Sequence, residues 1–239
     1  MARTPKKIKR AKGNSRPVPV KKTRRSAAVP KEKPPAFSKP VPSPSPWKTA
    51  WFHPLQTIRT VLQTNPRQGL PIIAFTYGLT QLIGMAEFRW GEYMELWAIV
   101  LVCIVLAWPL GYIAIHVQGW FLEVAGGIMG GYATNKQTTA VVIWGNVTTL
   151  INPFLDSFLI LMVGKAVFMK NPDPQEVGLW GALIIGIVAV THLLRIVWSA
   201  ILIIGQLAEV HQFSRWKAAA TLLILYSVGL FFAYLGRIL

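Results

Sequence analysis

The sequence predicts an all-α membrane protein: a bundle of five transmembrane helices, preceded by a disordered basic N-terminal tail and an interfacial helix. Of the 239 residues, 53% are hydrophobic and only 14% are charged, whereas soluble domains average about 25% charged residues. In addition, residues 178–208 form a long, almost wholly apolar run. As a helix this run measures about 46 Å, which exceeds the hydrocarbon core of a bilayer at about 30 Å.

The apolar run carries one arginine, Arg195, near its middle. Water cannot satisfy backbone amides within the hydrocarbon core, so this segment has to be helical throughout. A charge at that depth is costly and normally faces a protein or aqueous interior, where it finds a partner. One helix cannot shield its own charge, and Arg195 therefore predicts a bundle.

The net charge of +16 is concentrated in the N-terminal part of the chain. Residues 1–46 alternate basic clusters with proline and serine, and they hold too few apolar residues to offset chain entropy. We expect a disordered cytoplasmic tail that contacts anionic lipid head groups, at about 1 kcal/mol per basic residue near the membrane surface. A tail that only sets the orientation is the alternative. No aromatic residue precedes Phe37, so no nucleic-acid partner is expected.

Residues 47–69 are expected to form a short amphipathic helix that lies in the membrane interface. Their apolar residues recur at three- and four-residue steps, and Pro54 suits the first turn of a helix. Tryptophan side chains are typical interfacial anchors. A helix packed on the cytoplasmic ends of the spans is the alternative.

Residues 70–239 are expected to form the membrane domain. Its apolar runs predict five spans, at about 70–86, 97–120, 138–168, 178–208 and 218–236. A kink is expected in the second span at Pro109, and the third span is interrupted at Asn152-Pro153. The connector between these two spans contains Gly126-Gly127 and Gly130-Gly131 and is expected to be a flexible hinge.

Basic residues in the connectors set the expected orientation. They place the N-terminus in the cytoplasm and the C-terminus on the opposite side of the membrane, because Lys and Arg are retained on the cytoplasmic side. In a prokaryotic cell this membrane would be the plasma membrane.

Three stretches carry a pattern that goes beyond hydropathy. The residues concerned lie before the first span, before the third span and between the fourth and fifth spans: Trp51, Pro54, Asn65, Pro66, Gly130, Gly131, Glu209 and Arg215. In their order, and with five spans, they resemble the Yip family, the five-span membrane proteins named for interaction with Ypt/Rab GTPases, in its prokaryotic-type members. The resemblance covers residues 51–239.

The resemblance implies a five-span Yip domain with an adaptor-like role and no catalytic residue. It also implies two classes of protein partner, GTPase-like proteins and homologous membrane proteins, besides the lipid bilayer itself.

Four polar residues are expected to meet inside the bundle. Asp156 is the only acid deep in the third span, and His192 and Arg195 lie three residues apart on the fourth. We expect an Asp156–Arg195 ion pair with His192 and Asn152 nearby. Removing one partner of such a pair commonly costs about 3–5 kcal/mol. A clamp that fixes helix register is the favoured interpretation, and a proton or ion relay is the alternative.

The motifs of common enzyme classes do not occur in the sequence. It holds no phosphate loop, nucleophile elbow, HExxH or paired-cysteine motif, and its single cysteine, Cys103, lies in an apolar run. No enzymatic activity, cofactor or metal site is therefore expected. The predicted function is a non-enzymatic scaffold or adaptor that recruits partners or organises the membrane. The alternative is a small-solute or proton-coupled transporter that uses the broken third span and Arg195.

Overall fold

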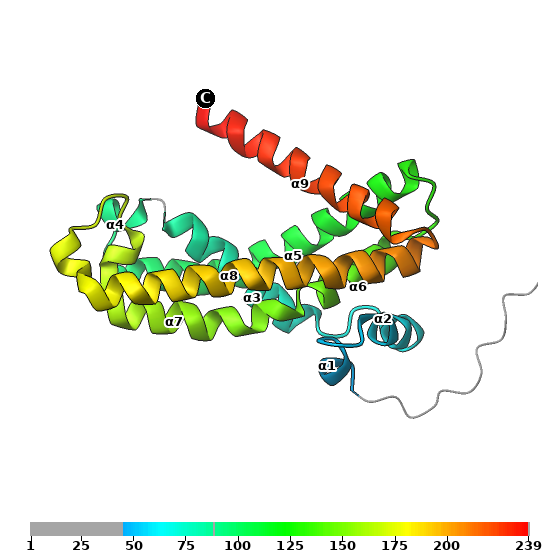
Figure 1. The fold of residues 1–239 in the computed structure, drawn as a ribbon, viewed down its shortest axis with the longest axis horizontal. Coiled ribbons are helices and arrows are strands. Elements are labelled where there is room, and N and C mark those ends of the chain that lie inside the picture. The colour runs from blue at the N-terminus through cyan, green and yellow to red at the C-terminus, as the bar shows by residue number, and fades with distance from the viewer. Residues whose placement is uncertain (1–44, 88, 239) are drawn as a thin grey trace, which may run out of the picture. The chain divides into compact units, whose positions relative to one another are not determined.

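The computed structural model describes residues 45–87 and 89–238, without the side chains of Glu176 and residues 232–238. Regular structure in these residues is helical throughout, with no strand (Figure 1). Apart from its last two residues, the predicted disordered tail, 1–46, lies outside the described residues.

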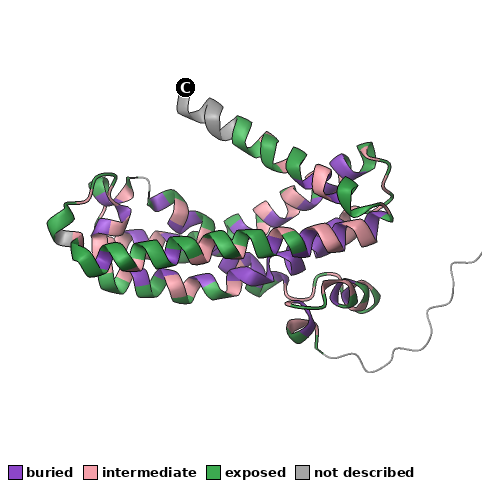
Figure 2. Ribbon diagram, viewed as in Figure 1, coloured by how far each residue is buried: buried purple, intermediate pink, exposed green. Residues whose placement is uncertain are grey.

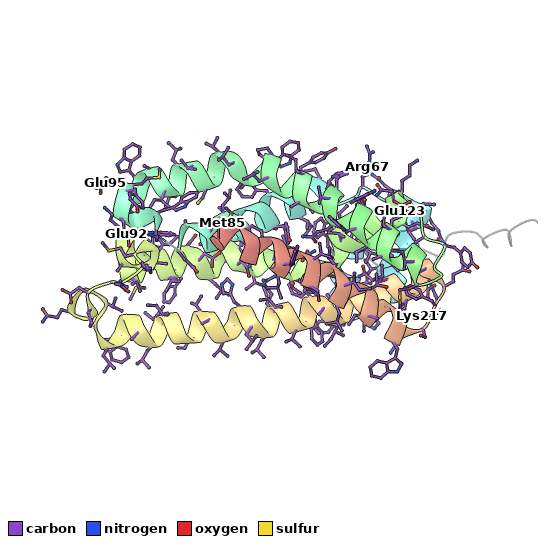
Figure 3. The ribbon with its side chains drawn as sticks, turned by 90° about the horizontal axis from the view of Figure 1, so that it is seen from above. Arg67, Met85, Glu92, Glu95, Glu123 and Lys217 are labelled. Atoms are coloured by element: carbon purple, nitrogen blue, oxygen red, sulfur yellow. The ribbon has the colours of Figure 1, made fainter. Side chains whose placement is uncertain are left out.

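The membrane domain is built from long apolar helices that run beside one another (Figures 1 and 3). Its helices are α3 (Leu70–Ala86), α5 (Leu96–Ile128), α6 (Asn135–Gly145), α7 (Asn152–Val163), α8 (Pro174–His211) and α9 (Arg215–Ile238). A short helix, α4 (Trp90–Tyr93), joins α3 to α5. Two 3-10 helices, η1 (Val147–Ile151) and η2 (Gly164–Phe168), flank α7.

Three helical segments of the described residues are long and apolar enough to cross a membrane: Leu96–Ile128, Asn135–Phe168 and Val177–His211. α3 is a shorter apolar helix, and the side chains of α9 are described only as far as Phe231. The outward face of α8 is exposed along its length (Figure 2) and carries large apolar residues such as Leu193 and Leu194. A continuous exposed apolar face is what lipid-facing helices present.

The third segment is broken, as the sequence predicts. α6 begins with a capping box in which the side chains of Thr134 and Gln137 satisfy each other's backbone amides. It ends at Gly145, the backbone then tightens into η1, and α7 restarts at Asn152 with Pro153 in its first turn. The interruption thus lies in the five residues before Asn152.

Helix α5 corrects the predicted connector. It continues through Pro109 and ends at Ile128, so Gly126 and Gly127 are helical and the loop begins only after them. The apolar residues that follow Trp120 extend the helix because nothing in that stretch interrupts its hydrogen-bond ladder.

Residues 46–63 form two short helices, α1 (Pro46–Thr49) and α2 (Pro54–Gln63). Helix α2 buries Thr57, Ile58 and Val61, and it contacts α6 and α8. The ring of Trp47 meets that of Trp144 on α6 edge-on, at 4.9 Å between centroids. In the structure this segment therefore packs against α6 and α8.

Helices α3 and α5 cross in close backbone contact. A Cβ atom on Gly78 would overlap the carbonyl oxygen of Ala107, and one on Gly111 would overlap that of Ala74. Ala74 and Gly78 are four residues apart, as are Ala107 and Gly111, so two small-xxx-small faces cross here. This crossing fixes α3 against α5 and thereby positions the polar side chains described next.

Candidate functional site

Asp156 on α7 is paired with a histidine rather than with the expected arginine. Its side chain is 4% exposed, and its Oδ1 accepts a hydrogen bond from Nε2 of His192 on α8 at 3.0 Å. The predicted Asp156–Arg195 ion pair is not formed. Three residues advance a helix by about 4.5 Å and leave the two side chains about 60° apart around its axis. His192 therefore lies level with Asp156, while Arg195 lies beside a neighbouring cavity.

Asn152 lies one turn before Asp156 on α7 and is fully buried. Its Nδ2 donates to Oγ1 of Thr80 on α3 at 2.9 Å. The second oxygen of Asp156 and the amide oxygen of Asn152 are both buried without a hydrogen-bond partner. Of the four predicted residues, the structure pairs Asp156 with His192 and places Asn152 one turn away on α7, while Arg195 forms no ion pair with Asp156.

Arg195 lines a cavity of about 670 Å³, which we call the intramembrane cavity. The residues around it come from α3, α5, α6, η1, α8 and α9. Its polar lining, a set that sequence reasoning missed except for Arg195, consists of Tyr77, Thr80, Gln81, Gln118, Asn146, Thr149, Arg195, Ser199 and Tyr226. Glutamines within apolar runs, such as Gln81 and Gln118, were the available signal, because polar side chains in a span normally face the interior.

A hydrogen-bonded group forms one wall of the intramembrane cavity. The hydroxyl oxygen of Tyr77 accepts from Nε2 of Gln81 at 2.9 Å and also accepts from Nε2 of Gln118. On another wall, Oγ of Ser199 donates to the carbonyl oxygen of Gly145 at 2.7 Å. These contacts hold neutral polar groups in fixed positions around Arg195.

Arg195 is the one charged residue among the described residues that line the intramembrane cavity. Its Nε is buried and has no hydrogen-bond partner. A guanidinium keeps its charge in nearly any protein environment, and it presents donors in a planar fork that matches carboxylate or phosphate oxygens. The cavity therefore combines a fixed cation with an unsatisfied donor, which suits an anionic ligand.

A second feature gathers at the end of the bundle formed by α2, the end of α8 and the start of α9. Oε1 of Glu209 accepts from Nε of Arg59 at 2.7 Å, and this contact raises the pKa of the Arg59 guanidinium. The pair is exposed and contributes less than about 1 kcal/mol. Beside it lies a groove of about 690 Å³, the end groove, whose lining includes Phe52, Pro54, Arg59 and Arg215.

His211, at the end of α8, is fully buried. A Cβ on either Gly126 or Gly131 would overlap its imidazole ring, and its Nδ1 accepts the N–H of Ala133 at 3.3 Å. Nζ of Lys217 also donates to the carbonyl oxygen of Met129 at 3.0 Å. The segment that contains Gly126, Gly127, Gly130 and Gly131, which we call the glycine segment, is thus packed around His211. This packing corrects the expectation of a flexible hinge.

Gly131→Ala is expected to destabilise the protein by about 1–3 kcal/mol, because the new methyl group overpacks the site of the His211 ring. The matched control is Gly127→Ala, since a Cβ at Gly127 meets nothing within 4 Å. Thermal unfolding in detergent measures both variants. Adding His211→Ala should remove the penalty of Gly131→Ala, and a penalty that persists would show that the clash is not its cause.

The remaining residues of the family pattern shape the chain around this end. Asn65 Oδ1 accepts the N–H of Arg67 at 3.0 Å in the turn before α3. Pro66 lies in the same turn, half-buried, and Trp51 packs against the core beside α2. Gly130 adopts a φ of +84°, a conformation that favours glycine, directly after α5.

Comparison with known proteins gives one match. A family model, the Yip1 domain, matches residues 48–236. No curated protein and no solved structure matches the chain. The matched range contains α2, the long apolar helices and all eight residues of the family pattern. The chain therefore belongs to the Yip1 domain family, and it is a membrane protein with transmembrane helices.

Proposed function

We propose that this protein is a non-enzymatic, five-span membrane scaffold that recruits a partner protein at its end groove. The supporting observation is that three segments far apart in sequence pack together at one end of the domain. They are α2, the glycine segment around His211 and the α8–α9 connection. The groove there exposes the ring of Phe52, at 74%, beside Arg59 and Arg215. Aromatic and arginine side chains are the residues that most often dominate protein interfaces.

The charge distribution supports a cytoplasmic position for this end. Arg67 and Lys217 lie at the same end of the bundle, where Glu123 also lies, and Glu92 and Glu95 lie at the other end (Figure 3). Under the positive-inside rule, the basic end faces the cytoplasm. The proposal includes α3 and α9 as the first and fifth spans, so that the N-terminus is inside and the C-terminus outside. A reporter enzyme fused after Leu239 that is active in the cytoplasm would contradict this topology.

A photo-crosslinking amino acid placed at Phe52 tests recruitment in native membranes. We expect it to capture a discrete partner protein, and we expect Arg215→Glu to abolish the capture by reversing the charge of the groove wall. The matched control position is Leu161 on α7, which is 83% exposed on an apolar face. Equal capture at Phe52 and Leu161, or capture that is unaffected by Arg215→Glu, would reject the end groove as the recruitment surface.

A second candidate function is a small-solute or proton-coupled carrier. It is supported by the break between α6 and α7 and by the intramembrane cavity with Arg195, since discontinuous helices mark substrate sites in transporters. Solute flux into proteoliposomes that is abolished by Arg195→Gln would favour the carrier over the scaffold. The scaffold predicts no flux above that of protein-free liposomes.

A further inference from the structure

The intramembrane cavity has a composition that the proposed scaffold does not explain. It combines the charge of Arg195 with the amides of Gln81 and Gln118 and the hydroxyl groups of Tyr77 and Tyr226. Among the described residues that line it, no carboxylate balances the arginine. Asp156, the acid on the adjoining helix, is bonded to His192 instead. The positive charge of Arg195 in this largely apolar cavity would therefore be stabilised by a ligand of negative charge.

The rest of the cavity wall is apolar. It is formed mostly by aliphatic and aromatic side chains of α5, α8 and α9, among them Val117, Phe121, Leu225 and Leu230. An inorganic anion would leave these surfaces without contacts. A molecule with an anionic head and a hydrocarbon tail would satisfy Arg195 and fill the apolar wall together.

The opening of the cavity also selects an amphiphile. α9 diverges from α5 and α8 along its length (Figure 1), and Val117 and Leu230, which line the cavity, are 46% and 71% exposed. These exposed residues are apolar and belong to helices that lipid surrounds. A ligand that enters past them comes from the bilayer, because a hydrated ion would have to shed its water at an apolar rim.

We propose that the intramembrane cavity binds a bilayer amphiphile, with its oxyanion head group on Arg195 and its hydrocarbon tail against α9. The head group is of phosphate or carboxylate type, because the planar fork of a guanidinium matches both. Gln118 and Gln81 line the same cavity, and the second N–H of each side-chain amide, beside the one donated to Tyr77, can donate to the head group.

The test uses the full-length protein in phosphatidylcholine nanodiscs that contain a trace of phosphatidylglycerol with a photoreactive acyl chain. After illumination, mass spectrometry measures the yield of crosslinks to the peptides of α5 and α9 that line the cavity. This readout leaves out lipid that is held against other helices. We expect Arg195→Gln to lower the yield at least tenfold, because a charge-assisted contact to the head group is lost. Arg67→Gln, an exposed arginine outside the cavity, is the matched control and should leave the yield unchanged.

Competitors identify the source of the anion. Excess oleate or unlabelled phosphatidylglycerol should abolish the crosslinks, whereas millimolar inorganic phosphate should not. Competition by inorganic phosphate would overturn the assignment to a bilayer amphiphile. Equal yields for Arg195→Gln and the wild type, or for phosphatidylcholine with the same photoreactive chain, would overturn the role of the arginine.

Leu225→Trp keeps the test decisive if Arg195→Gln does not fold. This substitution fills the cavity and leaves Arg195 in place. Loss of the crosslinks in folded Leu225→Trp protein supports the site, and retention of them rejects it. Recruitment through Phe52 at the end groove is measured separately, so failure of the lipid site and failure of the scaffold proposal can be told apart.

Discussion

Gly78→Ala is expected to cost about 3 kcal/mol of stability, because it overpacks the crossing of α3 and α5. The added methyl group would overlap the backbone carbonyl of Ala107 on α5. A flexible side chain can move away from such a clash, but a helix backbone moves only if the two helices separate. Because α3 and α5 also carry Tyr77 and Gln118, separation would disrupt the wall of the intramembrane cavity as well.

Gly84→Ala is the control for this substitution, because it changes the same helix by the same methyl group. A Cβ at Gly84 meets nothing within 4 Å, and replacing a helical glycine by alanine generally stabilises by about 0.5–1 kcal/mol. Denaturant titration of the purified protein in detergent compares the two variants. If Gly78→Ala unfolded at the same denaturant concentration as Gly84→Ala, the close crossing of α3 and α5 would be wrong.

Asp156→Ala is expected to cost about 3 kcal/mol or more, because it leaves His192 without the carboxylate that accepts its hydrogen bond. The substitution also opens space at a side chain that is only 4% exposed. The expected loss is a lower folded yield and a lower melting temperature in detergent, and it does not depend on any ligand.

A pair of double-mutant cycles identifies the partner of Asp156. Asp156→Asn and His192→Gln should be strongly non-additive, because their side chains are in contact at 3.0 Å. The cycle with Arg195→Gln should show a smaller coupling, since Asp156 and Arg195 form no ion pair. A charge swap between Asp156 and Arg195 should not restore stability. Rescue by that swap would reinstate the ion pair that the sequence suggested.

Local sequence features predicted the helices well because hydropathy and helix start and stop signals depend only on residues that are close together in the sequence. The predicted range 70–86 coincides with α3, and the break at Asn152-Pro153 adjoins η1. The sequence predicts a connector at Gly126 and Gly127, and glycine is a weak helix former. In the structure they extend α5, and Gly126 accommodates the buried ring of His211. Tertiary packing therefore overrode local propensity at this point.

The polar site shows the limit of sequence reasoning more clearly. The sequence indicated that Asp156, His192 and Arg195 belong inside a bundle, because a charged side chain in an apolar run is costly to expose to lipid. Which of them meet depends on the rotation and height of α7 against α8. A shift of one helical turn exchanges His192 for Arg195 as the partner.

The amino-acid sequence alone determined that this chain is a helical membrane protein of the Yip family with charge buried among its apolar helices. Hydropathy, charge asymmetry and short motifs are local properties, and they can be read from the sequence without knowledge of any tertiary contact. Only the tertiary structure decided that Arg195 forms no ion pair with Asp156 and lines a cavity with Tyr77, Gln118 and Tyr226. That grouping depends on how closely small residues let α3 and α5 approach and on where α9 diverges, and helix packing sets both.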